Sequence, residues 1–408
     1  MNSYDEIFSN PANGHENNIT TDGARELIRR GALVWNDWRN NCRSQSFVDF
    51  NMPGDAFDYS GFNFPAGIIF RDCHFNDLIK FNDAIFEGDV TFQCMFLKGA
   101  DFSNTEFRGK ANFKGCLWSV KAEVFFNAAH FLDNADFSAV NWDYYRDRLT
   151  AGYRYEDRYL RLQHYYENDI ASNILPYSDF SNAEFKKACV FNSRDFKGLV
   201  IFKKTVFYQV PEFLNVKMNP KIDMYTAVFP EIGQENGADL YRVLKNCFAE
   251  QKNTRQELRF FRKEMQEEMH VSGKSHRRWL RAYQIASDYG FSVCRPLIGL
   301  LALCAISLAA SLFLAQINGI AINASFASNR SYVESVDWGI TFKYIGFSIG
   351  NALPFFSGGK FDSNLIYELF GTGAVPEVVK IIALGQQCLS LVFWFLIGLA
   401  IRNKFKLK

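Results

Sequence analysis

Residues 178–213 read SDFSNAEFKKACVFNSRDFKGLVIFKKTVFYQVPEF. Phenylalanine returns in this stretch at steps that alternate between five and six residues, at Phe180, Phe185, Phe191, Phe196, Phe202, Phe207 and Phe213. A helix needs a spacing near 3.6 and a strand a spacing of two, so neither would keep these rings together. The steps bring them together only if the chain turns a corner about every five residues.

The same pattern occurs earlier in the chain, within residues 57–142. Its large positions are Phe70, Phe75, Phe81, Phe86, Phe92, Leu97, Phe102, Phe107, Phe113 and Trp118, followed after one slip by Phe126, Phe131, Phe137 and Trp142. Self-similarity of this kind is typical of a solenoid. Four sides would close one coil of about 20 to 22 residues, and coils stacked at roughly 4.8 Å would pile ring on ring.

Four cysteines fit this interpretation as small core residues. Cys73, Cys94, Cys116 and Cys189 each lie two residues before an aromatic position, in a slot that alanine fills in other repeats. Free cysteine behaves as a small hydrophobic residue. No C-x-x-C pair occurs in the sequence, so the spacing predicts neither a metal site nor a disulfide framework.

The Phe-centred steps, with polar turn residues between them, resemble the pentapeptide-repeat family. The resemblance covers 57–142 and 178–213. It implies a mainly β fold, a right-handed quadrilateral β-helix. Residues 143–177 separate the two blocks, and their charged, tyrosine-rich sequence predicts a helical insertion that leaves one coil.

The flanking segments differ from the repeats. Residues 1–21 are polar, lack the apolar core of a secretory signal, and are expected to be disordered. Residues 22–42 predict a helix that caps the first coil, with Trp35 and Trp38 on one face. Residues 237–290 predict a helical hairpin and stalk that turns near 252–254. This segment is either a coil cap and stalk or an oligomerisation helix.

Two long apolar runs predict a transmembrane hairpin over residues 297–401. Residues 297–315 and 381–401 carry no charge, and each is long enough for about 30 Å of hydrocarbon. The alternative is a pair of buried core helices. Basic residues precede the first run and follow the second, which predicts that both termini and the repeats are cytoplasmic. These residues are Arg277, Arg278, Arg281, Arg295, Arg402, Lys404, Lys406 and Lys408.

The link between the two runs contains a third apolar segment, 338–359, rich in glycine and broken by proline. It is either a re-entrant segment or an amphipathic helix on the membrane surface. In the first case Ser348, Gly350 and Asn351 would offer hydroxyl, backbone and amide groups at a constriction. The T-V-G-Y-G pattern of potassium filters is absent, so no potassium selectivity is predicted.

No sequence motif indicates catalysis. Phosphate-binding, dinucleotide-binding, zinc-protease and nucleophile-elbow motifs are absent, and the six histidines are scattered. We therefore expect no enzyme activity, no catalytic or metal-ligating residues and no cofactor. The net charge of +1 gives no reason to expect nucleic acid as a partner.

The functional hypotheses are accordingly non-enzymatic. One is a membrane-anchored scaffold whose partners are the lipid bilayer and an unidentified protein. The other is a homo-oligomeric pore gated by the cytosolic repeats. The C-terminal residues 393–408 resemble the ending of bacterial pentapeptide-repeat proteins with paired spans, which implies the bacterial inner membrane. The resemblance also implies, for some members, a role in stress or phage defence. Mimicry of DNA is disfavoured because the second block is rich in lysine.

Overall fold

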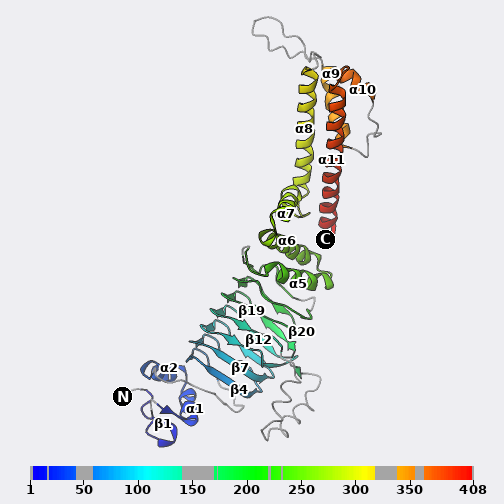
Figure 1. Ribbon diagram of the computed structural model, residues 1–408. Helices are drawn as coiled ribbons and strands as arrows, with labels where there is room; N and C mark the ends of the chain where they lie inside the picture. Colours follow the sequence, from blue (N-terminus) through cyan, green and yellow to red (C-terminus); the bar gives the residue numbers. More distant parts are fainter. Residues whose placement is uncertain are drawn as a thin grey trace. The chain divides into compact units, whose positions relative to one another are not determined.

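The computed structural model describes residues 3–15, 18–42, 58–139, 170–171, 173–218, 222–230, 233–317, 338–353 and 363–406. The chain divides into two compact units, Met1–Val271 and Ser272–Lys408. The first contains a β-solenoid with helices at its ends, and the second is entirely helical where it is described (Figure 1).

The solenoid consists of short strands that pair with the equivalent strand of the next coil. In one parallel ladder the order is β3 (Asn63–Phe64), β6 (Ile85–Phe86), β9 (Glu106–Phe107), β13 (His130–Phe131), β18 (Glu184–Phe185) and β22 (Val206–Phe207). In a second the order is β5 (Ile79–Lys80), β8 (Gly99–Asp101), β12 (Glu123–Phe125), β17 (Tyr177–Asp179) and β21 (Val200–Ile201). Because each inner strand of a ladder pairs with a strand on either side, its backbone groups find partners along the stack.

A third ladder completes most of the remaining backbone pairing. It joins β4 (Ile68–Phe75), β7 (Val90–Phe96), β10 (Ala111–Asn112), β14 (Ala135–Asp136), β19 (Cys189–Val190), β11 (Leu117–Ser119) and β15 (Ile170–Ala171). A further short parallel pair is formed by β16 (Ile174–Leu175) and β20 (Asp195–Phe196). All of these pairs are parallel except β11 with β15.

Buried aromatic rings form stacks along the solenoid. In one of these stacks the rings of neighbouring coils lie 4.6 to 5.2 Å apart between centroids and nearly parallel. Its members are Phe64, Phe86, Phe107, Phe131, Phe185 and Phe207. This separation matches the spacing of hydrogen-bonded strands, so the backbone ladder sets the ring stacking. The prediction of a repeat β-helix with a phenylalanine core is confirmed at the level of a parallel β-solenoid.

The expected ring register needs two corrections. Phe96, and not Leu97, stacks on Phe75 at 5.3 Å and on Trp118 at 4.4 Å. The cause is an irregularity in the pairing of β4 with β7, which shifts the register after Arg71. The solenoid also continues beyond residue 213: Phe229 stacks on Phe207 at 5.5 Å, and β-bridges join this last coil to the one before it.

The insertion interrupts one coil without disturbing the stack. Phe126 stacks on Phe180 and Phe131 on Phe185, at 4.9 and 4.6 Å. Most of the predicted helical insertion, residues 143–177, lies outside the described residues. Its described end is extended and includes strands β15 and β16, because the chain has already re-entered the β pattern there.

Two helices cover the last coil. They are α5 (Gly237–Glu250) and α6 (Thr254–Val271), joined by a turn in which Lys252 has a φ of 58°. Tyr241, Leu244 and Phe248 of α5 are buried against the same core as the ring stacks. Phe260 of α6 meets Phe229 edge-on at 5.1 Å. The pair therefore replaces the coil that would come next.

The second unit contains α7 (Lys274–Ser287), α8 (Cys294–Ile317), α9 (Trp338–Ala352), α10 (Ser363–Phe370) and α11 (Val375–Lys406). Helices α8 and α11 pack along each other, and α9 contacts both (Figure 1). Gly299 allows the close approach, because a Cβ at this position would lie 2.4 Å from the Phe393 ring.

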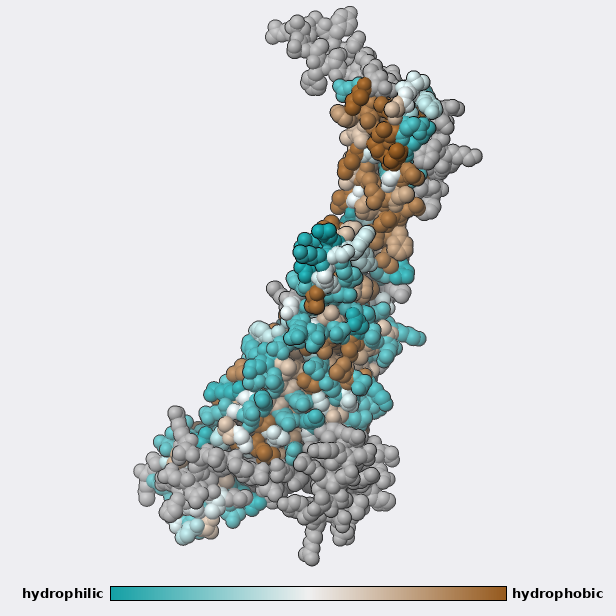
Figure 2. Space-filling view, viewed as in Figure 1, coloured by the Kyte–Doolittle hydropathy of each residue, from teal (hydrophilic) through white to brown (hydrophobic). Residues whose placement is uncertain are grey.

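Helices α8 and α11 are each long and apolar enough to cross a membrane. In the most apolar stretch of each helix only 17 % and 28 % of the residues are buried. Figure 2 shows hydrophobic residues gathered over these helices, whereas the visible surface of the solenoid is mostly hydrophilic. Helices in the core of a soluble domain would instead be largely buried.

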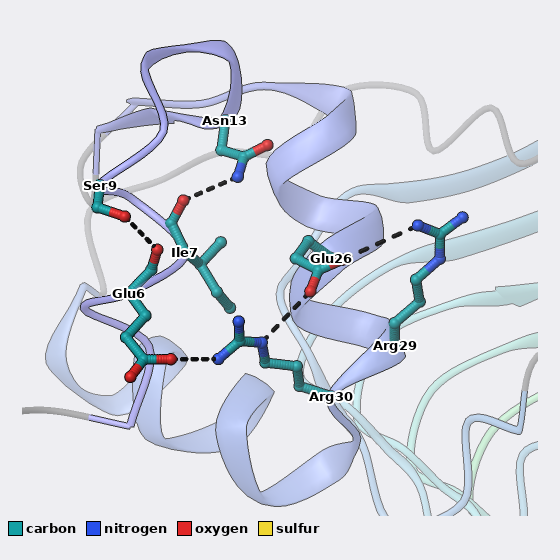
Figure 3. Close-up of polar contacts among 7 residues, drawn as sticks. All are labelled: Glu6, Ile7, Ser9, Asn13, Glu26, Arg29 and Arg30. Atoms are coloured by element: carbon teal, nitrogen blue, oxygen red, sulfur yellow. Dashed lines mark hydrogen bonds and ion pairs between the residues drawn. The ribbon is translucent and has the colours of Figure 1, made fainter.

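The N-terminal region differs from what its composition predicts. Residues 1–21 were expected to be disordered, but Tyr4 and Ile7 are buried in the solenoid core, and β1 (Gly14–His15) pairs with β2 (Asn18–Ile19). Polar contacts hold this segment to the following helix (Figure 3): Arg30 donates to carboxylate oxygens of Glu6 and Glu26, both at 3.3 Å. The packing depends on a few apolar residues, Tyr4 and Ile7, and the mainly polar composition of the segment does not indicate their burial.

The predicted helix over 22–42 is two helices, α1 (Thr21–Arg29) and α2 (Ala32–Asn41). They are separated at Gly31, whose φ of 92° suits glycine best. Helix α2 covers the first coil. Its Trp35 Nε1 donates to the Asn63 carbonyl oxygen at 2.8 Å, and Asn36 exchanges hydrogen bonds with the Gly61 carbonyl and the Asn63 amide.

Candidate functional site

The predicted ladder residues all lie in the core of the solenoid. Each is exposed by 2 % or less: Phe70, Phe75, Phe81, Phe86, Phe92, Phe180, Phe185, Phe191, Phe196, Phe202 and Phe207. Burial of this completeness leaves no ring accessible to a ligand. These residues define a rigid core, so a functional surface must come from outward side chains, from the insertion or from the helical unit.

One charged side chain lies inside the coil. Arg194 occupies the inward slot two residues before Phe196, where other repeats have alanine or cysteine, and it is 1 % exposed. Its Nε donates to the Phe137 carbonyl oxygen at 2.5 Å, and its Nη atoms donate to the carbonyls of Ile174 and Phe113 at 3.3 and 3.4 Å. Phe137 precedes the insertion and Ile174 lies in its described C-terminal end, so the guanidinium joins the two ends of the interrupted coil.

Burial lowers the pKa of Arg194 to about 10, while Cys116 and Asp136 oppose this shift. The cation is therefore held mainly by peptide carbonyls, which are weaker partners than a carboxylate. Such a group is expensive to bury and is retained only where it satisfies other buried atoms. Its role here is to donate to the carbonyl oxygens of Phe137 and Ile174, and to add a second donor to the Phe113 carbonyl, which also accepts from the Cys116 amide at 3.1 Å.

The inward cysteines are inert by their surroundings. Burial raises the pKa of Cys116 to about 12, and it raises the pKa values of Cys94 and Cys189 as well. The thiols of Cys94 and Cys116 donate to the carbonyl oxygens of Phe70 and Phe92, both at 3.3 Å. Because the thiolate is the reactive form, these residues are unsuited to redox chemistry or metal binding.

The outer face of the solenoid is covered by ion pairs between neighbouring side chains, such as Lys187 with Asp133 at 2.6 Å and Lys197 with Asp195 at 2.8 Å. Exposed apolar side chains increase toward the last coils. Tyr208 is 50 % exposed and Val228 is 53 % exposed. Val228 forms a β-bridge with Val206 of the preceding coil, and Tyr208 lies two residues after Val206. Lys186 Nζ lies 4.0 Å from the Tyr208 ring centroid and donates to the Tyr208 hydroxyl at 2.8 Å. These two residues, the Tyr208–Val228 patch, have the most exposed large apolar side chains in the described part of the solenoid.

A second candidate site is a buried polar cluster among α8, α9 and α11. The Ser307 hydroxyl of α8 donates to Gln386 Oε1 of α11 at 2.6 Å. Gln386 Nε2 donates in turn to the carbonyl oxygen of Ser348 in α9 at 2.8 Å. The Ser348 hydroxyl returns to α8, where it donates to the Cys304 carbonyl at 2.8 Å. One chain of hydrogen bonds thus joins all three helices.

The C-terminal end of α9 lies against α11 within this cluster. Ser390 Oγ lies 3.5 Å from the Asn351 carbonyl oxygen, and Trp394 Nε1 donates to the Ala352 carbonyl at 3.0 Å. The last carbonyls of a helix have no partner within the helix and must find donors elsewhere. The Trp394 side chain of α11 provides such a donor, whereas the Ser390 hydroxyl donates mainly to the Gln387 carbonyl oxygen of its own helix at 2.8 Å.

Of the three residues predicted to line a constriction, the structure brings two together. Ser348 and Asn351 are 2 % and 8 % exposed, and Asn351 Oδ1 accepts from Gln387 Nε2 at 3.0 Å. Asn351 Nδ2 is buried and has no hydrogen-bond partner among the described residues. Gly350 makes none of these side-chain contacts, and a Cβ there would meet nothing within 4 Å.

Sequence reasoning missed Ser307, Gln386, Ser390 and Trp394. A signal was present: Gln386, Ser390 and Trp394 recur at steps of four within an uncharged run, which places them on one helix face. Within the described ranges, no group of three or more histidine, cysteine, aspartate or glutamate side chains could hold a metal ion.

Comparisons with models of known protein families, with curated proteins and with solved structures find no match to this chain.

Proposed function

We propose that this chain is a membrane-anchored scaffold whose pentapeptide-repeat domain binds a protein partner in the bacterial cytoplasm. The observation that carries the proposal is the contrast between the units. The solenoid buries its apolar side chains, whereas α8 and α11 expose theirs, with Ile306 at 67 %, Ile381 at 72 % and Phe395 at 69 %. Apolar surface of this extent requires a nonaqueous partner.

The proposal includes a right-handed, four-sided coil. Its support is the repeat spacing together with four sets of inward side chains, of which Phe75, Phe96 and Trp118 form the least regular stack. In the described residues the core is filled by stacked rings and small side chains, which favours a binding function over an enzymatic one. A role in stress or phage defence would be exercised through the bound partner.

The proposed orientation places both termini in the cytoplasm of a bacterium, at the inner membrane. Arg295 lies in the first turn of α8, and Arg402 and Lys404 lie in the last turns of α11. Basic residues are retained on the cytoplasmic side of short membrane hairpins. The two ends lie together, because Asn403 Nδ2 donates to the carbonyl oxygen of Gly290, just before α8, at 3.1 Å.

Two native thiols test the membrane insertion. Cys294 begins α8 and Cys388 lies in the middle of the apolar run of α11, and both side chains are exposed. In inside-out vesicles a charged maleimide should modify Cys294 in a C388S variant. It should not modify Cys388 in a C294S variant until detergent and denaturant are added, because hydrocarbon excludes the reagent.

Equal modification of both thiols in intact vesicles would show that α11 is in water. Labelling of Cys294 from the outside of intact spheroplasts, and not in inside-out vesicles, would reverse the proposed orientation.

The Tyr208–Val228 patch tests the scaffold function. Full-length protein with a photo-cross-linking residue at position 208 should give a discrete adduct in cells, and V228D should abolish it. L132D is a matched control, because Leu132 is a 37 % exposed residue elsewhere on the solenoid. Absence of any adduct at position 208, with normal membrane insertion, would remove the patch as a binding surface.

A second candidate function is a homo-oligomeric pore. The course of α9 favours this function. Its Tyr344 hydroxyl donates to the Leu369 carbonyl oxygen of α10. Its C-terminal end lies against Ser390 and Trp394 of α11. Helix α9 therefore extends from the level of α10 to the level of Ser390 and Trp394 on α11, as the helical half of a re-entrant segment would. Such backbone persists at membrane depth where protein or water covers it.

Planar-bilayer recording decides the pore hypothesis. If several copies surround water, purified protein should conduct, and N351L should reduce the current because Asn351 offers a buried amide. I349L is the control, since Ile349 is 48 % exposed on the same helix. Oligomers that are silent at all voltages would contradict this function, and they would leave the scaffold proposal intact.

A further inference from the structure

Helix α7 exposes a mixed basic and apolar face. It contains Lys274, Arg277, Arg278 and Arg281, and no acidic residue. Two large apolar side chains on it are almost free of protein contact, with Trp279 at 75 % and Ile285 at 68 % exposure. At 100° per residue, Trp279, Ala282, Ile285 and Ala286 share a sector that borders the basic side chains. The opposite side of the helix is buried at Leu280 and Ser287.

This helix is attached to the ends of both spans. Arg295 Nη1, in the first turn of α8, donates to the Gln284 carbonyl oxygen of α7 at 2.8 Å. Tyr283 of α7 meets Tyr289 edge-on at 5.5 Å. Gly290 follows at once, and a Cβ there would lie 3.1 Å from the Leu399 side chain of α11. Helix α7 is therefore held at the level where the apolar runs of α8 and α11 end.

We propose that α7 is an interfacial helix that binds the headgroups of anionic phospholipids in the cytoplasmic leaflet. The inference rests on the proposed membrane insertion, because the ends of the two spans fix α7 at headgroup depth. Trp279 and Ile285 enter the acyl boundary, where indole rings are favoured. The arginines reach phosphate oxygens, with their aliphatic stems along the apolar boundary.

The chemistry of the face favours lipid over a protein partner. An acidic protein surface would satisfy the arginines but would leave the apolar sector in water. A neutral apolar partner would bury Trp279 but would remove Arg278 from water without a counter-charge, which is costly. An anionic bilayer surface offers phosphate groups to the arginines and hydrocarbon to Trp279 and Ile285, so it satisfies both parts of the exposed face.

The test uses full-length protein in proteoliposomes, with an environment-sensitive fluorophore on A282C. Cys247, Cys294, Cys304 and Cys388 are serine in this background. In vesicles of phosphatidylcholine and phosphatidylglycerol the probe should be protected from iodide and its emission shifted to the blue. R278Q with R281Q should lower the docked-to-undocked ratio roughly thirty-fold, at about tenfold or less for each arginine. Added salt should also lower the docked-to-undocked ratio, because it screens the charges.

Two controls make the result specific. K203Q with K204Q removes the same charge from the solenoid and should change nothing, and a probe on K252C should stay open to iodide in every vesicle. If the position-282 probe is quenched equally with and without anionic lipid, while Cys388 in the separate C294S protein stays protected from maleimide, the headgroup proposal fails and membrane insertion stands. If protection in pure phosphatidylcholine is equal and insensitive to R278Q with R281Q, the docking is apolar only, and the anionic-lipid proposal is overturned.

Discussion

At the scale of single residues, stability in the solenoid depends on which side chains can lie inside a coil. Rings fill the corners and stack at the strand spacing, and small residues fill the slots beside them. Outward positions have no such constraint. Two phenylalanines of the same solenoid can therefore differ greatly in how much free energy of unfolding is lost when they are replaced, and this difference can be measured.

Phe191 and Phe125 provide the comparison. Phe191 is fully buried between Phe137 and Phe213, at centroid distances of 5.0 and 5.1 Å. F191A should lower the free energy of unfolding by about 3 to 5 kcal/mol, from lost burial and the cavity that remains. F125A should cost about 1 kcal/mol or less, because this ring is only half-buried beside Tyr177. Urea unfolding followed by circular dichroism measures both, and equal losses would contradict the assigned core.

Arg194 is the exceptional inward residue. R194M keeps the volume but removes the guanidinium donors to the carbonyls of Phe113, Phe137 and Ile174. Although replacing a buried ion pair by apolar groups can stabilise a protein, here the carbonyl oxygens of Phe137 and Ile174 lose this donor, whereas the Phe113 carbonyl keeps its bond from the Cys116 amide at 3.1 Å. We expect a loss of about 3 kcal/mol in the same unfolding measurement.

K197M is the matched control for R194M. It removes an ion pair in which the Lys197 side chain is 51 % exposed, and it should cost less than about 1 kcal/mol. A gain in stability for R194M would show that the buried cation is a net liability.

At the scale of elements, the ends of the solenoid need covers, since an open coil presents unpaired backbone to other chains. Helix α6 provides such a cover through Arg259. Its Nη atoms donate to the carbonyl oxygens of Met224 and Ala227 at 2.8 and 2.6 Å, and its guanidinium lies 5.2 Å from the Phe229 ring centroid. Burial lowers the pKa of Arg259, as expected of a cation enclosed by the cap.

R259Q should therefore cost about 2 kcal/mol and promote association through the uncovered last coil. R255Q, one turn earlier on α6, should cost less than about 1 kcal/mol, because Arg255 only lies over the exposed Tyr225 ring. Thermal unfolding and light scattering measure the two effects. Aggregation of R255Q to the same degree would mean that the cap acts through its general charge.

The helical hairpin depends on one close contact. At Gly299 a Cβ would lie 2.4 Å from the Phe393 ring, whereas at Gly398 it would meet nothing within 4 Å. G299V should separate α8 from α11 and destabilise the hairpin by about 1 to 3 kcal/mol, and G398V should be neutral. Unfolding of the full chain in bicelles with increasing SDS provides the measurement. Equal behaviour of the two variants would place the helix contact elsewhere.

The sequence predicted elements best where their spacing is regular. Strict steps of five and six located the ring stacks, because only a repeating corner produces them. The assignment of Leu97 to a ring stack is wrong because a local register shift between β4 and β7 puts Phe96 inward. The last coil was missed because Met224 occupies an inward slot where the pattern expects an aromatic residue. The polar cluster was missed because its hydrogen bonds join three helices that are distant in sequence.

At the scale of the whole molecule, the chain combines two units with different solvent requirements. The first is closed at both ends by α2 and by the α5–α6 pair, and its outer face carries ion pairs. The second exposes apolar helices and has a basic helix at their base. Under the proposed function, the second unit would fix the location of the protein in a membrane while the solenoid presents its surface to a partner.

If the units are independent, the division at Val271–Ser272 should be a place where the chain can be cut. Residues 1–271 alone should be soluble and monomeric, and should unfold cooperatively at the temperature found for the solenoid of the full chain. The reason is that the last coil is covered by Tyr241, Phe248 and Phe260, all within this fragment. A cut after residue 236 removes that cover and should give aggregates, which serves as the control. Aggregation of 1–271 to the same extent would mean that the second unit, Ser272–Lys408, completes the solenoid fold.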